Sequence, residues 1–154
     1  MTTRSRSVQV GDEAPAFTLR DQHETPVSLA DFRGRPVVLF FYPKDDTPGC
    51  TLESCTFRDH FADFQALGVE LIGISSDDEA SHLRFANRHG LRYALLADHG
   101  GKVRQAYGVP KTFGLLAGRV TYVIDRQGFV RHIFSSQLNV RKHVTQALSA
   151  LRTL

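Results

Sequence analysis

Residues 37–67 constrain the fold most, because this stretch changes hydrophobic period midway and contains both cysteines of the chain. Residues 37–42 (VVLFFY) are an unbroken apolar run, which is typical of a strand buried on both faces of a sheet. From Cys50 onward the period is helical. A loop with two prolines and a glycine, PKDDTPG, separates the two segments. The sequence therefore predicts a buried strand, a tight loop and a helix that begins near Cys50.

The two cysteines fall on different faces of this predicted helix. At about 100° per residue, the side chains within about 60° of Cys50 are a glutamate and three phenylalanines, namely Glu53, Phe57, Phe61 and Phe64. Cys50 therefore shares the face that packs on a core. Cys55 is displaced from Cys50 by roughly 140° and lies on a mixed flank with Leu52, Asp59, Ala62 and Ala66.

A thiol at the start of a helix is chemically special. The unpaired N–H groups of the first turn and the positive end of the helix dipole favour the thiolate over the thiol. Lys44 adds a positive charge nearby. Because the thiolate is the nucleophilic form, the position predicts a reactive Cys50. The alternative is a buried inert thiol, which is common for free cysteine.

The loop and helix start carry a resemblance to a known family. Pro43, Thr47 and Cys50 stand in the spacing P-x-x-x-T-x-x-C, within the stretch YPKDDTPGCTLESC. This stretch resembles the peroxiredoxins, and among them the subgroup of the bacterioferritin comigratory proteins and peroxiredoxin Q. The likeness extends from about residue 10 to residue 151. It implies a thioredoxin-like α/β fold with an N-terminal β-hairpin extension, and peroxidase activity with no metal, flavin, haem or nucleotide cofactor.

The resemblance also implies roles for the residues of the motif. Cys50 matches the peroxidatic cysteine that attacks the peroxide, and Cys55 matches the resolving cysteine of the subgroup. Thr47 is expected to aim its hydroxyl at the sulfur or the peroxide. Pro43, which has no N–H group, is expected to form a wall of the pocket.

Two charged residues complete the site that the resemblance implies. The family places an arginine at the start of a late strand, in a context that matches Arg119 of GRVTYVID. A guanidinium suits this place because it stays protonated and presents several donors in a plane. Glu53 resembles the acidic residue that orients this arginine. Without the resemblance, Arg119 reads as an exposed strand-end residue and Glu53 as a solvated helix carboxylate.

The cycle implied by the family begins with reduction of hydrogen peroxide or an organic hydroperoxide, which leaves Cys50 as a sulfenic acid. Cys55 then forms an intramolecular disulfide with it, and thioredoxin or a similar dithiol protein restores both thiols. In a regular helix, residues five apart have Cα atoms about 8.7 Å apart, beyond the roughly 7 Å limit of a disulfide. The helix is therefore expected to be continuous through Cys55 when reduced and unwound when oxidised.

The remaining pattern predicts a central mixed sheet with helices on both sides, in one domain over residues 10–154 after a flexible N-terminus at 1–9. The expected elements are two short strands around a turn at 21–24, a helical turn capped by Ser28, a strand at 69–75, a helix from Asp77 or Asp78 to Gly90, a strand at 93–97, a short helix at 102–108, a hairpin of strands 119–125 and 129–135, and a helix at 139–152.

Composition excludes several other classes. With 154 residues, 42% hydrophobic and 23% charged, the chain has the make-up of an ordinary globular domain. No segment approaches the ~20 apolar residues of a membrane span, and MTTRSRSVQV lacks the apolar segment of a secretory signal, so a cytoplasmic location without membrane contact is expected. The net charge of +3 is spread along the chain, so no nucleic acid is expected as partner. An internal resolving cysteine favours a monomer.

Three rival functions stay open at this point. A thiol-disulfide oxidoreductase would typically use C-x-x-C, whereas four residues separate Cys50 from Cys55. A peroxide sensor that relays oxidation to a partner would share the first chemical step with a peroxidase. A metal-binding module would need more ligands than the cysteines supply, and the scattered histidines, expected mostly at the surface, show no suitable spacing.

The loop after Gly108, VPKTFGLLAG, departs from the pattern of many subgroup members, which carry a bulky aromatic and a longer charged loop. It resembles the shorter peroxiredoxin Q variant of plants and cyanobacteria. Phe113, Leu115 and Leu116 can form an apolar rim that favours organic hydroperoxides, or they can pack on a core of their own.

Overall fold

The computed structural model describes residues 7–109, 111–112 and 116–154, and its centre is a seven-stranded sheet. The strands of this sheet are β1 (Thr18–Arg20), β2 (Pro26–Ser28), β3 (Val37–Phe41), β4 (Glu70–Ser75), β5 (Ala94–Ala97), β8 (Val120–Ile124) and β9 (Val130–Ser135). Their order is β2-β1-β5-β4-β3-β8-β9. β3, β4 and β5 run parallel, and the other pairings are antiparallel. The predicted mixed sheet with an N-terminal hairpin is confirmed.

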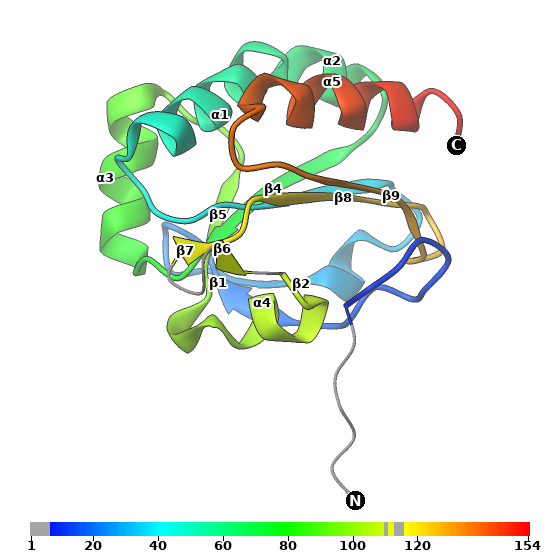
Figure 1. Cartoon of the computed structure of the whole chain (residues 1–154), viewed down its shortest axis with the longest axis horizontal. Helices are drawn as coiled ribbons and strands as arrows, with labels where there is room; N and C mark the ends of the chain where they lie inside the picture. Colours follow the sequence, from blue (N-terminus) through cyan, green and yellow to red (C-terminus); the bar gives the residue numbers. More distant parts are fainter. Residues whose placement is uncertain (1–6, 110, 113–115) are drawn as a thin grey trace, which may run out of the picture.

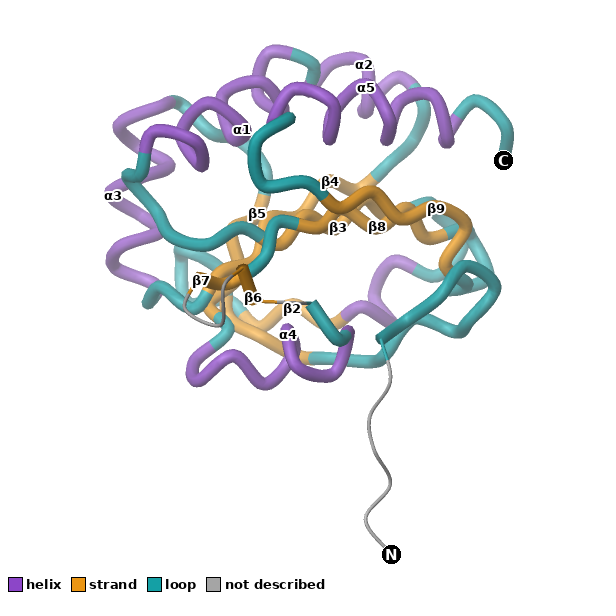
Figure 2. The backbone as a smooth tube through the Cα atoms, viewed as in Figure 1, coloured by secondary structure: helices purple, strands orange, loops and turns teal. Residues whose placement is uncertain are grey.

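Helices cover both faces of the sheet, as predicted (Figures 1 and 2). One face carries α1 (Pro48–Asp59), α2 (Phe61–Ala66), α3 (Glu79–His89) and α5 (Val140–Leu151), and the other carries α4 (Lys102–Tyr107) and the 3₁₀ helix η1 (Leu29–Phe32). A short 3₁₀ turn, η2 (His99–Gly101), precedes α4. A separate pair of short strands, β6 (Lys111–Thr112) and β7 (Leu116–Ala117), was not predicted from the sequence.

Strand β3 divides the hydrophobic interior into two clusters. Val38 and Phe40 point to the cluster under α1 and α5, whereas Val37, Leu39 and Phe41 point to the cluster on the α4 side. All five residues are buried, because alternate side chains of a strand face opposite sides of the sheet and both sides are covered.

The predicted helix ends are present where the sequence places them. The Asp78 carboxylate accepts a hydrogen bond from the Ser81 backbone N–H (2.8 Å) and caps α3. Gly90, with φ of 63°, ends the same helix in the left-handed region that glycine tolerates. Ser28 and Asp31 form the capping box of η1.

The helical period that begins near Cys50 predicts one helix over the rest of the 37–67 stretch, but the helix is broken at His60, which has φ −105° and ψ 10° and separates α1 from α2. The Nδ1 atom of this histidine lies 3.0 Å from the Thr56 carbonyl oxygen, so its side chain competes for an acceptor of the helix backbone. The two faces of α1 are as predicted. Cys50 and Glu53 are fully buried, and Cys55 is half-buried.

The first described residues are held against the body of the protein. The Val8 N–H donates to the Tyr107 carbonyl oxygen (3.1 Å), and the Ser7 hydroxyl donates to that of Gly108 (3.1 Å). The rest of the N-terminus expected to be flexible, residues 1–6, lies outside the described residues.

Two histidines depart from the expected surface location. His82 on α3 and His143 on α5 are fully buried. Both lie on helix faces that pack on the sheet, and both ring nitrogens of each lie near polar atoms. Burial of a polar ring is tolerated when its nitrogens are satisfied in this way.

Gly73 in β4 makes room for the aromatic cluster beneath α1. A Cβ atom at this position would lie 2.8 Å from the Phe40 Cζ atom and 2.9 Å from the Leu95 Cδ2 atom. The Phe40 ring stacks on Phe57 of α1, with a centroid distance of 4.3 Å and an interplanar angle of 16°. The missing side chain therefore lets the Phe40 ring lie between β4 and the helix that carries Cys50.

We expect Gly73→Ala to lower the free energy of unfolding by about 1–3 kcal/mol, the usual cost of overpacking a core. Urea denaturation followed by circular dichroism measures it. Phe40→Leu should relieve part of the crowding, so the double variant should lose less stability than the sum of the single losses. Fully additive losses would contradict the proposed contact.

Candidate active site

Cys50 lies in the first turn of α1, directly after the loop that follows β3. Thr47 is the N-cap residue and Pro48 occupies the first helical position, where a missing N–H group is no loss. The first intrahelical hydrogen bond runs from the Thr51 N–H to the Thr47 carbonyl oxygen (2.8 Å). The N–H groups of Gly49 and Cys50 therefore come before the first hydrogen bond of the helix. They can donate to negative charge at the Cys50 sulfur.

Arg119 lies beside this sulfur. It immediately precedes β8 and is 5% exposed, and Cys50 is one of the groups whose charge acts on its guanidinium. Its Nη1 atom donates to Glu53 Oε1 (2.6 Å) and its Nε atom to the Gln137 carbonyl oxygen (3.3 Å). The structure thus brings together Cys50, Glu53 and Arg119, three of the residues that the sequence singled out.

Burial and charge oppose each other in this cluster. Burial by itself lowers the pKa of Arg119, but the charges of Glu53 and Cys50 outweigh burial and raise it above its ordinary value. Burial raises the pKa of Glu53 to about 7, although Arg119 acts to lower it. Arg119 is therefore a permanent cation, whereas Glu53 changes charge near neutral pH.

Thr47 and Pro43 lie in the loop before the helix, both partly buried. The Thr47 hydroxyl donates to the carbonyl oxygen of Lys44 (2.8 Å), which can only accept. The hydrogen of Thr47 is therefore in use, and its oxygen is left as an acceptor for an incoming O–H group. The expected role of Thr47 is therefore limited to one of its two forms. Its hydroxyl oxygen can accept a hydrogen bond from a peroxide, but its hydrogen is not available to the sulfur.

The sequence did not predict how the loop is held. The buried Asp45 carboxylate accepts hydrogen bonds from the hydroxyls of Tyr42 (2.6 Å) and Ser81 (2.9 Å), and its Oδ2 atom lies 2.7 Å from His82 Nδ1. The other ring nitrogen of His82 donates to the Leu96 carbonyl oxygen (3.0 Å). These contacts tie the loop before Cys50 to α3. The sequence signal that could have indicated this contact is His82, a polar residue on the apolar face of a predicted helix.

Asp45, Asp77 and His82 offer three ligand atoms within 4.8 Å of one another. Hydrogen bonds already use them, since Asp77 Oδ2 accepts from the Ser75 hydroxyl (2.6 Å) and the Asp45 N–H (2.8 Å). The arrangement therefore fits a hydrogen-bonded clamp of the loop.

Cys55 lies on the other side of α1, and both thiols are free within one continuous helix. Burial raises the pKa of Cys55; Arg58 lowers it and Asp59 raises it further. Between the two cysteines, the Ser54 carbonyl oxygen accepts a hydrogen bond from the Tyr93 hydroxyl (2.7 Å). This buried contact ties the middle of α1 to the segment before β5.

Parts of the loop after Gly108 lie outside the described residues, among them Phe113 and Leu115. The side chain of Leu116 is also outside the description. The apolar rim expected from these residues therefore stays a prediction.

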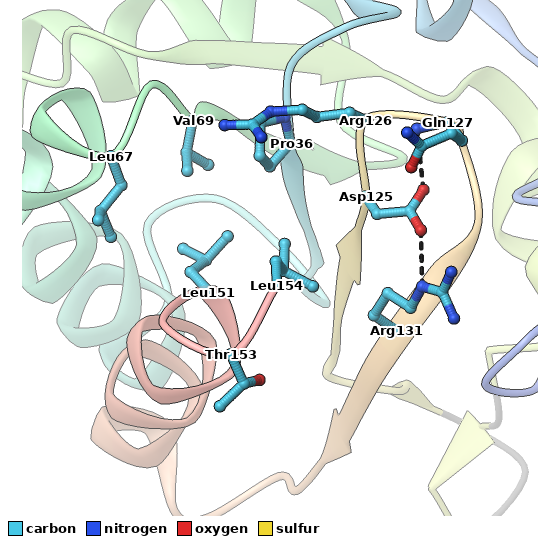
Figure 3. Close-up of a pocket in the computed structure, with 10 residues that line it drawn as sticks. All are labelled: Pro36, Leu67, Val69, Asp125, Arg126, Gln127, Arg131, Leu151, Thr153 and Leu154. Atoms are coloured by element: carbon cyan, nitrogen blue, oxygen red, sulfur yellow. Dashed lines mark hydrogen bonds and ion pairs between the residues drawn. The ribbon is translucent and has the colours of Figure 1, made fainter.

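A surface pocket of about 570 Å³ is shown in Figure 3. It is at the opposite end of the sheet from Cys50, because its residues lie near the start of β3 and Cys50 follows the end of this strand. It lies where β3 begins and β8 ends, beside the C-terminus of α5, and is lined by Pro36, Leu67, Val69, Asp125, Arg126, Gln127, Arg131, Leu151, Thr153 and Leu154. The Asp125 carboxylate there accepts hydrogen bonds from the Gln127 N–H (3.0 Å) and Arg131 Nε (2.6 Å). None of the predicted site residues lines this pocket.

Comparisons with known proteins all point to one family. The model of the AhpC/TSA family matches residues 10–133. Peroxiredoxin Q, chloroplastic, of Arabidopsis thaliana is 51% identical over 146 residues, which cover 94% of this chain and 68% of the relative.

Two solved structures extend the comparison to the fold. Peroxidoxin BcpB of Mycobacterium tuberculosis matches with a TM-score of 0.88 and 38% identity over 96% of this chain and 98% of that one. The Xanthomonas campestris bacterioferritin comigratory protein, described with alkyl peroxide reduction activity, matches with a TM-score of 0.85 and 27% identity over 95% and 96%. The expected thioredoxin-like fold is confirmed by these matches.

No helix in the part of the chain that the structure describes is long and apolar enough to cross a membrane. The rice and Arabidopsis relatives are named as chloroplastic proteins, which concerns those proteins. The comparisons thus do not support the cytoplasmic location expected from the sequence, which stays a prediction.

Gly49 offers a direct test of the Arg119 position. A Cβ atom there would lie 3.0 Å from Arg119 Nη2, so Gly49→Ala must displace the guanidinium by a few tenths of an ångström. We expect the rate constant of Cys50 with hydrogen peroxide to fall roughly three- to tenfold, because reacting groups tolerate little misplacement. Stopped-flow measurement of thiol loss gives the rate.

The stability of Gly49→Ala serves as its internal control. Alanine is the better helix former by about 1 kcal/mol, so the melting temperature should be unchanged or higher. A slower reaction with unchanged stability supports the contact, whereas a wild-type rate would show that the guanidinium is not held against the first turn of α1.

Proposed function

This chain belongs to the AhpC/TSA family and is a peroxidase of the peroxiredoxin class, and from that premise we propose that Cys50 is its peroxidatic cysteine and Cys55 its resolving cysteine. One observation carries the proposal: the sulfur of Cys50 lies at a helix start with the guanidinium of Arg119 as its partner, and Glu53 holds that guanidinium. A permanent cation and first-turn N–H groups stabilise a thiolate and the charge that develops during attack.

In the first step, the sulfur of the Cys50 thiolate attacks one peroxide oxygen. A sulfur–oxygen bond forms and the oxygen–oxygen bond breaks, and the leaving oxygen takes the electron pair and a proton to become water or an alcohol. Cys50 becomes a sulfenic acid and has lost two electrons to the peroxide. Arg119 stabilises the developing negative charge, while Thr47 accepts a hydrogen bond from the incoming O–H group.

In the second step, the sulfur of Cys55 attacks the sulfur of the sulfenic acid. The electron pair of the Cys55 sulfur forms the disulfide bond, the sulfur–oxygen bond breaks, and the hydroxyl leaves as water with the proton of the Cys55 thiol. Residues five apart in a regular helix have Cα atoms about 8.7 Å apart, so α1 must unwind between the two cysteines. The half-buried position of Cys55 places it on the side of α1 that can open to solvent.

In the third step, thioredoxin or a similar dithiol protein restores the enzyme. One partner thiolate attacks the disulfide and forms a mixed disulfide, and the second partner thiol then releases this protein with both cysteines reduced. The partner leaves oxidised to a disulfide. The electrons thus pass from the dithiol protein to the peroxide through Cys55 and Cys50.

We propose hydrogen peroxide and organic hydroperoxides as substrates. The alkyl peroxide reduction described for the Xanthomonas campestris relative supports the second class. Several expectations from the sequence remain predictions: residues 10–154 act as one domain, the protein is a monomer in the cytoplasm, and the reaction uses no cofactor.

The cysteine roles are tested with three forms of the protein: wild type, Cys50→Ser and Cys55→Ser. With thioredoxin, thioredoxin reductase and NADPH, wild type should turn over hydrogen peroxide and Cys50→Ser should show no turnover. Cys55→Ser should form a sulfenic acid that dimedone traps, and then stall before recycling. Stoichiometric oxidation of wild type without turnover would instead favour a peroxide sensor, and activity of Cys50→Ser would exclude the proposed mechanism.

The unwinding step should respond to Tyr93. Tyr93→Phe removes the hydrogen bond to the Ser54 carbonyl between the two cysteines, so we expect roughly two- to fivefold faster disulfide formation after oxidation of Cys50. Rapid quenching with an alkylating agent, followed by mass spectrometry, counts the free thiols over time.

Tyr122→Phe is a matched control, because the Tyr122 hydroxyl bonds to the Tyr107 carbonyl oxygen on the other side of the sheet (3.4 Å). It should leave the rate of disulfide formation unchanged. An unchanged or slower rate in Tyr93→Phe would mean that the opening of α1 does not break this contact.

A further inference from the structure

The second carboxylate oxygen of Glu53 is buried without a hydrogen-bond donor. Oε1 receives the hydrogen bond of Arg119, but Oε2 has no partner among the described residues. The polar atom facing it is Nδ1 of His143 on α5, at 3.6 Å, and both side chains are fully buried. A buried polar atom with no hydrogen-bond partner lowers the stability of the fold, so a functional role for this arrangement is worth testing.

The tautomer of His143 follows from its other contacts. Nε2 lies 2.8 Å from the Ser136 carbonyl oxygen, which can only accept, so Nε2 carries the ring hydrogen. Nδ1 then has a lone pair, which accepts a hydrogen bond from the Thr121 hydroxyl (2.7 Å). Burial lowers the pKa of His143 to about 4, and the Arg119 charge also lowers it, so the ring is neutral near pH 7.

An ionised Glu53 therefore faces a second acceptor, and no hydrogen lies between them. Protonation of Oε2 removes the negative charge that faces this lone pair, so the contact with Nδ1 disfavours the ionised form of Glu53 relative to the neutral form. The other groups around Glu53 are Arg119, which favours the charged form, and Tyr93 and Cys50, whose negative forms would oppose it. His143 and burial thus act together against the charge that Arg119 favours.

We propose that His143 is a positioning residue, which acts on the peroxidase site through Glu53. Because it presents an acceptor to Glu53 Oε2, it keeps a proton on this carboxyl. The charge of Arg119 is then left to act on the Cys50 sulfur. Thr121 fixes the ring orientation that this needs. The catalytic consequence rests on the proposed function of Cys50, whereas the protonation of Glu53 does not.

The sign of the pH effect follows. Glu53 is mostly neutral below about pH 7 and ionised above it. In the ionised form it takes a larger share of Arg119 and places a negative charge near the thiolate, which opposes attack on peroxide. A variant that lets Glu53 ionise at lower pH should therefore be slower only in the range where the wild-type carboxyl still holds its proton.

The first experiment measures Glu53 directly. The chain has five glutamates, and labelling their side-chain carboxyl carbons with ¹³C allows each to be titrated by NMR in the reduced protein, with Glu53→Gln to assign the signal. The wild-type midpoint should lie near pH 7. His143→Gln keeps a donor for the Ser136 carbonyl but removes the facing acceptor, so the midpoint should fall by about one pH unit.

Two further variants control this measurement. His132→Gln, on β9 with Gln146 as its partner, removes a half-buried histidine away from Glu53 and should leave the midpoint unchanged. Thr121→Val removes the donor to Nδ1 and frees the lone pair for Glu53, so the midpoint should rise. This opposite shift also tests the inference if His143→Gln does not fold. An unchanged Glu53 midpoint in folded His143→Gln or folded Thr121→Val would overturn the proposal.

The second experiment compares the rate constants of wild type and His143→Gln with hydrogen peroxide from pH 6 to 9. The variant should be slower by up to about threefold near pH 6.5, the ratio of the neutral fractions of Glu53 that a one-unit shift gives, and equal to wild type near pH 9, where Glu53 is ionised in both. An equal loss at all pH values would mean that His143 is merely structural. Activity of Cys50→Ser would instead refute the proposed function and leave the Glu53 titration standing.

Discussion

The structure around the reactive thiol depends on one buried contact, the hydrogen bond from Arg119 before β8 to the Glu53 carboxyl in α1. Taking the Arg119 charge out of water is expensive, and this cost is offset only when the guanidinium finds partners in good geometry. Here the 2.6 Å contact, the Gln137 carbonyl and the Cys50 sulfur supply those partners. Removing Glu53 would leave the Arg119 charge in the interior without this partner. The pair therefore holds the helix, the sheet and the thiol in one arrangement.

The sheet determines that this pair can form. Phe41 at the end of β3 pairs with Val120 at the start of β8, so Arg119 comes to the edge of the sheet where the loop to Cys50 begins. The same edge contains the ends of the parallel strands, a common place for functional sites in α/β folds. From the other side, Asp45 and His82 tie the loop to α3. The reactive thiol is thus supported by elements that are distant in the chain.

The helix that carries both cysteines combines stability with the capacity to open. Its buried face packs through Phe57, and its break at His60 makes it a separate unit from α2. The proposed disulfide requires this unit to unwind between Cys50 and Cys55. The contacts that unwinding must break include those of Tyr93 with Ser54 and of Arg119 with Glu53, and the rate of opening depends on them.

The sequence by itself determined the strand, loop and helix order, the helix caps and the face on which Cys50 lies, because these follow from local periodicity and turn chemistry. The motif and its family resemblance also singled out Arg119 and Glu53. Only the tertiary structure decided that their charges meet, that the loop is clamped by His82, and that His143 faces Glu53. These contacts join residues far apart in the chain, and strand register and helix packing determine them. A helix pattern shows that position 143 faces inward, but the partner it meets there depends on how α5 crosses α1.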